Sequence, residues 1–369
     1  MESTHLDRRR LSTPALVFII IAASAPLTVL AGGIPTNYAV AGLLGVPQTY
    51  IALGLILLLF AVGYTAMSRE IQNAGAFYAY VTEGLGNRQG IATALVALVA
   101  YNMMQIGLYG LFGFAASNLI LEFTGLALPW WLTALAAWLL VALLGVRSID
   151  VSAKVLGVIV ALEFLVVIIV DIMALGIAPE GVTGEAFQAS EFFAPGIGLL
   201  FAFGVAAFMG FESGAIYSEE VVDPQRTVAR ATYIALAVIA LFYAFTAWAV
   251  GIGVGPSNVV EESQTLGPDL IFAWLGEHSP MLANFANLLF VTSLLAVLLA
   301  FHNAVARYFF ALGRSTVLPR FLGKTGSNGA PQNGSMIQSG LAFVVVVGFA
   351  IAGAGHELGR YDGSRMGNP

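Results

Sequence analysis

The sequence predicts an all-α protein that crosses a membrane several times. Of its 369 residues 59% are hydrophobic and only 10% are charged, whereas about a quarter of the residues of a soluble domain are charged. Apolar stretches near the ~20 residues needed to cross a bilayer recur along the chain, and none alternates polar and apolar residues as a membrane β-barrel requires. A helical bundle follows, because only helices and closed barrels satisfy their backbone hydrogen bonds within lipid.

Nine apolar stretches are long enough to be expected as spans. The third and the eighth are long enough to tilt strongly or to extend beyond the bilayer. In chain order the nine are Pro14–Ile34, Thr49–Met67, Gln89–Leu121, Pro129–Val146, Val151–Ile177, Pro195–Tyr217, Ala231–Val254, Met281–Leu312 and Met336–Ala354.

The basic residues predict the orientation of these spans. Thirteen of the fifteen lysines and arginines fall on one side if the nine spans are right, and the exceptions are Arg360 and Arg365. The opposite loops, around Glu180–Glu191 and Glu261–His278, carry carboxylates but no lysine or arginine. Because basic loops stay in the cytoplasm, residues 1–13 are expected to be a cytoplasmic segment of a multi-pass protein of the cytoplasmic membrane.

The composition argues against several other classes of protein. The absence of cysteine excludes disulfides, thiolate zinc sites and thiol catalysis. The four histidines are scattered without the spacing of metal ligands. We therefore expect no enzyme, no cofactor, no metal site and no nucleic-acid partner; the partners expected are a small molecule and the lipid bilayer.

Two of the expected spans are interrupted in the middle. The sixth carries Gly204, Gly210 and Glu212, and a carboxylate at bilayer depth costs about 3 kcal/mol or more unless it faces the protein interior or water. The first contains Pro26, which cannot donate a backbone hydrogen bond and disfavours helix at Ala25. Interrupted helices five spans apart indicate an inverted-repeat transporter with its binding site between them.

Four stretches, in the expected order, resemble motifs of the amino acid–polyamine–organocation (APC) superfamily of permeases. The most specific reads FMGFES followed by EEVVDPQRTVARA, which resembles the family's Phe-x-Gly-Phe-Glu, Glu-Glu, Asn/Asp-Pro and Arg. The four are Met67–Gly86, Gly145–Lys154, Phe208–Ala231 and His302–Pro319, and together the resemblance covers residues 11 to 350.

The resemblance implies a five-plus-five inverted-repeat helical bundle of the LeuT type, with a first repeat at residues 14–177 and a second at 178–354. It also implies a site for an amino acid between the broken helices. Backbone N–H groups at the first break would bind the carboxylate, and carbonyls at the second would bind the amine. By position these are Ser24, Ala25 and Leu27 at the first break, and Phe203 to Ala207, including Gly204, at the second. Since Ala23–Pro26 stands where relatives have Gly-Ser/Ala-Gly, the identity of the donors stays open.

Two buried carboxylates are candidates for ion coupling. Glu212 occupies the family's motif position, where it would brace the broken helix and change protonation during the cycle, or remain permanently protonated. Glu163 stands where proton-coupled relatives have a lysine. It would form a proton site, or a cation site completed by Thr292 and Ser293. Asp171, eight residues further, is expected to be solvated near the outer end of its span.

Aromatic and amide side chains complete the expected site, each with a packing alternative. Tyr101 and Gln105 share one helical face, where they would select the substrate side chain or join helices as polar contacts. Phe203 and Phe208 would cover the substrate or simply pack. Arg69 and Glu220, with Asp223 and Arg226, would form ion pairs at the cytoplasmic end or be solvated.

The function expected is secondary active transport of amino acids or related small amines by alternating access, coupled to protons, with sodium as the alternative. An exchanger, a non-transporting membrane sensor and an inactive fragment on the same fold are the other interpretations. The fragment is considered because residues 355–369 form a polar tail after nine spans, whereas the fold needs ten core helices. A missing tenth helix predicts a C-terminal truncation and an unstable or inactive polypeptide.

Overall fold

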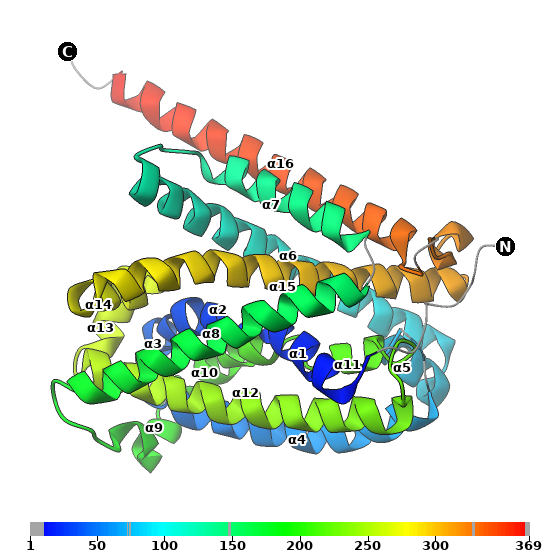
Figure 1. Ribbon diagram of the computed structural model, residues 1–369, viewed down its shortest axis with the longest axis horizontal. Coiled ribbons are helices and arrows are strands. Elements are labelled where there is room, and N and C mark those ends of the chain that lie inside the picture. Colours follow the sequence, from blue (N-terminus) through cyan, green and yellow to red (C-terminus); the bar gives the residue numbers. More distant parts are fainter. Residues whose placement is uncertain (1–10, 72, 74, 147–148, 327–328, 366–369) are drawn as a thin grey trace.

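The computed structural model describes residues 11–71, 73, 75–146, 149–326 and 329–365 (Figure 1). Most of this described part is helical; turns and loops connect the helices, and an isolated β-bridge joins Leu11 and Val221. Eight of its helical segments are long and apolar enough to cross a membrane, and a further apolar helix, α7 (Trp130–Gly145), has 16 residues. The all-α membrane bundle is therefore confirmed, and α7 is the shorter member among the nine expected spans.

The long helices are α4 (Val46–Glu70), α6 (Asn87–Thr124), α8 (Ile149–Ile177), α12 (Pro224–Val254), α15 (Pro280–Arg314) and α16 (Gln332–Arg365). The two broken spans consist of α1 (Thr13–Ser24), α2 (Pro26–Thr28), η1 (Val29–Gly33) and α3 (Ile34–Ala41), and of α10 (Ile197–Gly204), η3 (Val205–Phe208) and α11 (Ser213–Ile216). Connecting segments contain α5 (Phe77–Leu85), η2 (Glu185–Phe187), α9 (Ala189–Phe192), α13 (Val259–Leu266), η4 (Gly267–Asp269), α14 (Leu270–His278) and η5 (Arg320–Gly323).

The first span breaks where the sequence predicts. Helix α1 ends at Ser24, and Ala25 adopts a left-handed backbone conformation with φ +48°. Pro26 then begins α2, and because it lacks an N–H it cannot continue the hydrogen-bond ladder of α1. The π-helix Val29–Gly33 follows, and such segments interrupt α-helices frequently at functional sites.

The second broken span opens after Phe208 and touches the first. Gly210 has φ +92°, which glycine adopts without the strain that a Cβ would bring. A Cβ placed on Gly210 would lie 2.5 Å from the Cβ of Ala23 in α1. The close approach of the two breaks therefore depends on glycine at this position.

The long helices enclose these broken spans. Helices α4 and α12 pack side by side along one edge of the bundle, and α7 packs against α6 and α16 along the opposite edge (Figure 1). The segments α1, α2, α3 and α10 lie between these groups, with α8 and α15 packed against α1. Helix α15 is buried over most of its length, so it forms the centre of the core.

One boundary differs from the sequence prediction. Helix α16 continues past Ala354 to Arg365, so most of the expected polar tail, residues 355–369, is helical in its backbone; residues 366–369 lie outside the described part. Polar residues can extend a helix, because the backbone hydrogen bonds of a helix form within it whatever the polarity of the side chains. The division into two repeats at residue 177 stays a prediction.

Candidate functional site

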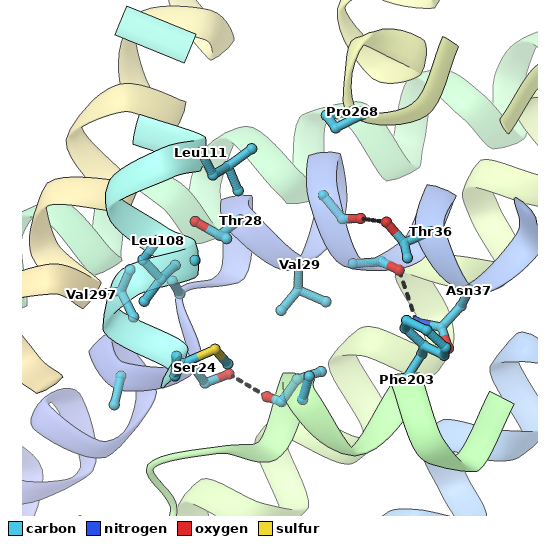
Figure 2. A pocket seen from close by; sticks show the side chains of 18 of the residues that line it. Ser24, Thr28, Val29, Thr36, Asn37, Leu108, Leu111, Phe203, Pro268 and Val297 are labelled. Atoms are coloured by element: carbon cyan, nitrogen blue, oxygen red, sulfur yellow. Dashed lines mark hydrogen bonds between the residues drawn. The ribbon is translucent and has the colours of Figure 1, made fainter. Parts of the chain in front are cut away.

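A cavity of about 310 Å³ lies between the two broken spans and α6 (Figure 2). This volume is at the lower end of the roughly 300–1,000 Å³ usual for small-molecule sites. Its wall is formed by Ala23, Ser24, Ala25, Thr28, Val29, Gly32, Gly33, Thr36, Asn37, Tyr50, Met103, Met104, Gly107, Leu108, Leu111, Phe203, Ala206, Ala207, Pro268 and Val297. Four of the expected substrate-binding residues are in this wall, namely Ser24, Ala25, Phe203 and Ala207.

The backbone donors at the first break are engaged in this conformation. The N–H of Ala25 donates to Ile21 at 2.9 Å, and the N–H of Leu27 donates to the Glu163 carboxylate at 3.3 Å. Leu27 is fully buried and outside the cavity wall. A substrate carboxylate would have to replace these partners, or would use the space in front of Ser24.

A hydroxyl joins the two breaks at the base of the cavity. The Ser24 hydroxyl donates to the carbonyl of Ala207 at 3.0 Å, as Figure 2 shows, and lies 2.5 Å from the Tyr243 hydroxyl. Gly204 lies behind the cavity wall, where a Cβ would approach Asn37 and Leu53. The site is thus closed on this side by a direct contact between the two broken helices.

The two expected gate phenylalanines have different surroundings. Phe203 lines the cavity with 44% of its surface exposed, so it is placed to cover a bound molecule. Phe208 is only 1% exposed and packs on Tyr50 with the ring centroids 6.3 Å apart. Phe208 therefore belongs to the core behind the cavity.

Glu163 is completely buried directly behind the first break. Its Oε2 accepts the hydrogen bond from Leu27, and its Oε1 has no hydrogen-bond partner in the described part of the chain. Ser293 adjoins the carboxylate and lies 3.1 Å from the Thr28 hydroxyl. Thr292, expected beside Ser293, instead donates to Leu289 within its own helix. Glu163 and Ser293 are therefore brought together, and Thr292 is not.

The Asp171 side chain is buried, in contrast to the solvated position expected from sequence. It is 1% exposed and accepts a hydrogen bond of 2.9 Å from Thr246 of α12. The expectation failed because α12 packs against α8 at Asp171, and sequence alone does not show which face of a span is covered.

Glu212 braces the second broken span toward α6. The Tyr101 hydroxyl donates to its Oε1, and the Tyr64 hydroxyl donates to its backbone carbonyl at 2.6 Å. Tyr101 itself packs between Phe301 and Tyr308, outside the wall of the cavity. Glu212 and Tyr101 are thus hydrogen-bonded to each other on the side of the cavity that faces the beginning of α1.

A comparison with known proteins identifies the family of the chain. Residues 15–354 match the family described as Amino acid permease. The chain belongs to this amino acid permease family. Eight of its described helical segments are long and apolar enough to cross a membrane, as expected of a multi-pass membrane protein of this family.

Individual relatives of the permease match over shorter stretches. It is 22% identical to the low-affinity putrescine importer PlaP of Escherichia coli over 283 residues, or 74% of this chain and 60% of PlaP. It is 34% identical over 125 residues to the uncharacterized transporter Rv1999c of Mycobacterium tuberculosis and to Mb2022c of Mycobacterium bovis, which is 34% of this chain and 27% of those proteins. The chain thus spans less than two thirds of the length of these relatives.

Gln105 of the permease is used for packing rather than for the cavity. The amide of Gln338 in α16 donates to the Gln105 side chain at 2.5 Å and to Asn102 at 3.0 Å. Gln105 also donates to the carbonyl of Leu298 at 3.4 Å. These polar contacts join α6 to α15 and α16, which is the packing alternative considered for Gln105.

An ion-pair cluster closes the end of the permease near the beginning of α1. Arg307 and Glu220 form a bidentate pair at 2.5 and 3.0 Å, with both side chains at least 96% buried. Arg307 also lies over the Tyr217 ring, 4.2 Å from its centroid. Leu11 adds two backbone hydrogen bonds of 3.1 Å to the same segment, with Glu220 and Val222. The partner of Glu220 is therefore Arg307, where Arg69 was expected.

The sequence did not predict the wall that α6 contributes. That wall consists of Met103, Met104, Gly107, Leu108 and Leu111, which form the face next to Tyr101 and Gln105. The sequence did contain a sign of this wall, namely apolar residues and Gly107 at helical spacing. The polar face with Tyr101 and Gln105 was the more obvious candidate for the site. The π-helix that brings Gly32 and Gly33 to the cavity was indicated only by the glycine pair itself.

Proposed function

We propose that this permease is a secondary active transporter of amino acids or related small amines across the cytoplasmic membrane, coupled to protons and working by alternating access. The observation that carries the proposal is the cavity enclosed by two broken helices whose interruptions touch at Ser24 and Ala207. Interrupted helices place helix ends at the site, and the dipoles of these ends suit the charged groups of a zwitterionic substrate.

Glu163 supports the coupling part of the proposal. It lies within the membrane-spanning bundle, one hydrogen bond away from the break in the first span. When it is ionised, it holds the Leu27 N–H; when it is protonated, that interaction weakens and the N–H becomes available. Protonation of Glu163 would therefore alter the segment next to the substrate, which is what coupling requires.

The closed end supports alternating access. The Tyr101–Glu212 contact and the Arg307–Glu220 pair lie on the side where α1 begins, whereas the cavity reaches Pro268 in the loop on the other side. With the N-terminus in the cytoplasm, this conformation is closed to the cytoplasm and faces outward. Transport then requires these contacts to break as the outer side closes.

Purified protein reconstituted in liposomes tests the proposal. We expect uptake of labelled amino acids that increases when the outside is made acidic. Glu163→Gln should retain binding but remove the dependence of uptake on the pH gradient. Asp171→Asn, which neutralises another buried acid of the same helix, is the matched control and should keep the dependence.

The alternatives correspond to distinct results. Uptake that requires an amino acid inside the liposomes would contradict secondary active uptake and indicate an exchanger. Binding without uptake would contradict transport and indicate a sensor. Uptake by Glu163→Gln that still depends on the pH gradient would show that Glu163 has only a structural role. Uptake by the parent chain that is stimulated by a sodium gradient instead of a pH gradient would contradict the proton coupling.

A further inference from the structure

The wall of the cavity carries no ionisable acid or base other than a tyrosine hydroxyl. Its twenty described residues include no aspartate, glutamate, lysine, arginine or histidine, although the whole chain has 36 charged side chains, 15 basic and 21 acidic. The carboxylate of Glu163 lies behind the wall, where it accepts a hydrogen bond from the Leu27 N–H of the first break. A second charge on a substrate would thus find no counter-charge in the wall of the cavity.

One side of the cavity is a continuous apolar surface. It consists of Met103, Met104, Leu108 and Leu111 of α6 and Val297 of α15. Figure 2 shows Leu108, Leu111 and Val297 together on the side facing Val29, across from Phe203 and Asn37. Methionine and leucine side chains adapt well to an apolar guest, so this wall fits an aliphatic side chain.

Most polar side-chain atoms of the cavity already have partners inside the protein, and the exception is Asn37 Oδ1, which is buried without a hydrogen-bond partner in the described part of the chain. Thr36 donates to the carbonyl of Gly32 at 2.6 Å and Asn37 to that of Gly33 at 2.8 Å. Ser24 donates to Ala207, and Thr28 meets Ser293. These groups stabilise the backbone of the broken spans, and the backbone near Ser24 and Ala207 is left as the polar end of the cavity.

The size of the cavity agrees with a medium-sized amino acid. A volume of about 310 Å³ leaves room for an amino acid such as leucine or methionine. A diamine is disfavoured by its charge rather than by its size, because its second ammonium group would lose hydration against the apolar wall.

We infer that the substrate is a neutral α-amino acid with an apolar side chain, whose side chain packs on Met104, Leu108 and Val297 while its charged groups stay at the Ser24–Ala207 end. This inference rests on the proposed transport function and narrows its substrate class. It separates this permease from a diamine importer such as its distant relative PlaP, because an unpaired ammonium buried on an apolar wall is strongly unfavourable.

Competition in reconstituted liposomes tests the inference directly. Labelled leucine is the probe, and unlabelled leucine, methionine, valine, alanine, lysine, glutamate and putrescine compete. We expect apparent affinity to fall about tenfold for each methylene removed from the side chain, and putrescine, lysine and glutamate to compete at least about 100-fold more weakly than leucine. Putrescine or lysine competing as well as leucine would overturn the inference.

Two glycines of α6 provide a matched pair of variants. A Cβ on Gly107 or on Gly110 meets no atom within 4 Å, so both positions accept a side chain without a clash at its first atom. Gly107 lines the substrate cavity and also a second, apolar cavity of about 250 Å³ between α6, Trp130 and α16, whereas Gly110 lines the second cavity and not the first. Gly110→Leu therefore controls for any effect of filling the second cavity. Gly107→Leu should lower leucine affinity at least about tenfold, and Gly110→Leu should leave it unchanged.

A gain of charge gives the complementary result. Met104→Glu adds a carboxylate to the apolar wall, so it should weaken leucine and strengthen putrescine relative to the parent chain. Equal effects of Gly107→Leu and Gly110→Leu, or no change of preference in Met104→Glu, would overturn the assignment of the wall. Failure of every compound to be taken up would contradict the proposed transport itself, whereas strong uptake of putrescine with none of leucine would contradict only the substrate class.

Discussion

Loss of the Arg307–Glu220 pair should open the end of the protein near the beginning of α1, which is proposed to face the cytoplasm. Both side chains are almost completely buried, at 3% and 4% exposure, and two hydrogen bonds join them. Removing one partner of such a pair leaves an uncompensated buried charge and costs about 3–5 kcal/mol. The pair connects α15 to the segment that follows α11. Its loss therefore destabilises the conformation that is closed at this end of the protein.

The expected size of the effect follows from this free energy. Since each 1.4 kcal/mol changes an equilibrium constant tenfold, Arg307→Met should shift the balance toward the cytoplasm-open conformation by about 100-fold or more. Arg314→Met is the matched control, because Arg314 also pairs with a glutamate, Glu219, but its side chain is 25% exposed. This pair is only partly buried, so its loss should cost less than the loss of the fully buried pair, and the control should shift the balance much less.

Thiol reactivity measures the opening. The chain has no cysteine, and Ser213 is buried next to Tyr101 and Tyr217 beneath the pair. In a Ser213→Cys background, Arg307→Met and Glu220→Gln should each accelerate reaction with a small thiol reagent from the cytoplasmic side, and Arg314→Met should do so far less. Equal reactivity in the three variants, each verified as folded by its thermal transition, would refute the role of the pair.

Two further predictions concern the breaks and the orientation. Gly210→Ala should destabilise the protein by about 1–3 kcal/mol, because φ is +92° and the new Cβ would meet Ala23. The control Gly198→Ala, which adds a Cβ in open space on the same span, should cost less than about 0.5 kcal/mol. Equal shifts of the thermal transition in the two variants would show that the contact between the breaks is unimportant. For orientation, a cysteine at the exposed Thr265 should react with an impermeant reagent outside intact cells, and one at the exposed Asn87 only after permeabilisation; labelling of Asn87 from outside would reverse the topology.

Much of the fold was predictable because lipid imposes simple rules. The apolar runs marked the spans, and Pro26 and Gly210 marked the two breaks, since a missing N–H and a residue free of Cβ strain have direct backbone consequences. The end of α16 was less predictable. Residues after Ala354 are polar, but the helix continues to Arg365, because polarity decides immersion in lipid rather than backbone conformation.

The site was predictable in outline and less so in detail. Ser24, Ala25, Phe203 and Ala207 line the cavity as expected, because the breaks themselves create it. Tyr101 and Gln105 lie outside its wall, paired with Glu212 and Gln338. Spacing showed that they share a helical face, but the rotation of α6 about its axis depends on packing with α15 and α16.

Partner choice for buried charges was the hardest to predict. Glu220 pairs with Arg307, 87 positions away in the chain, and Asp171 is bonded to Thr246. Both contacts depend on the three-dimensional packing of long helices. A single sequence shows that a buried carboxylate needs a partner, but not which helix provides it.

Protection of a cysteine in the cavity tests most directly that substrate binds between the two broken spans. Ala206 lines the cavity and is exposed in it, so Ala206→Cys should react readily with a small thiol reagent from outside. Leucine should slow this reaction in proportion to its occupancy of the site, at the concentration that half-saturates uptake, without slowing the reaction of a cysteine at Thr265. Full transport of leucine with no protection at Ala206→Cys would contradict the account.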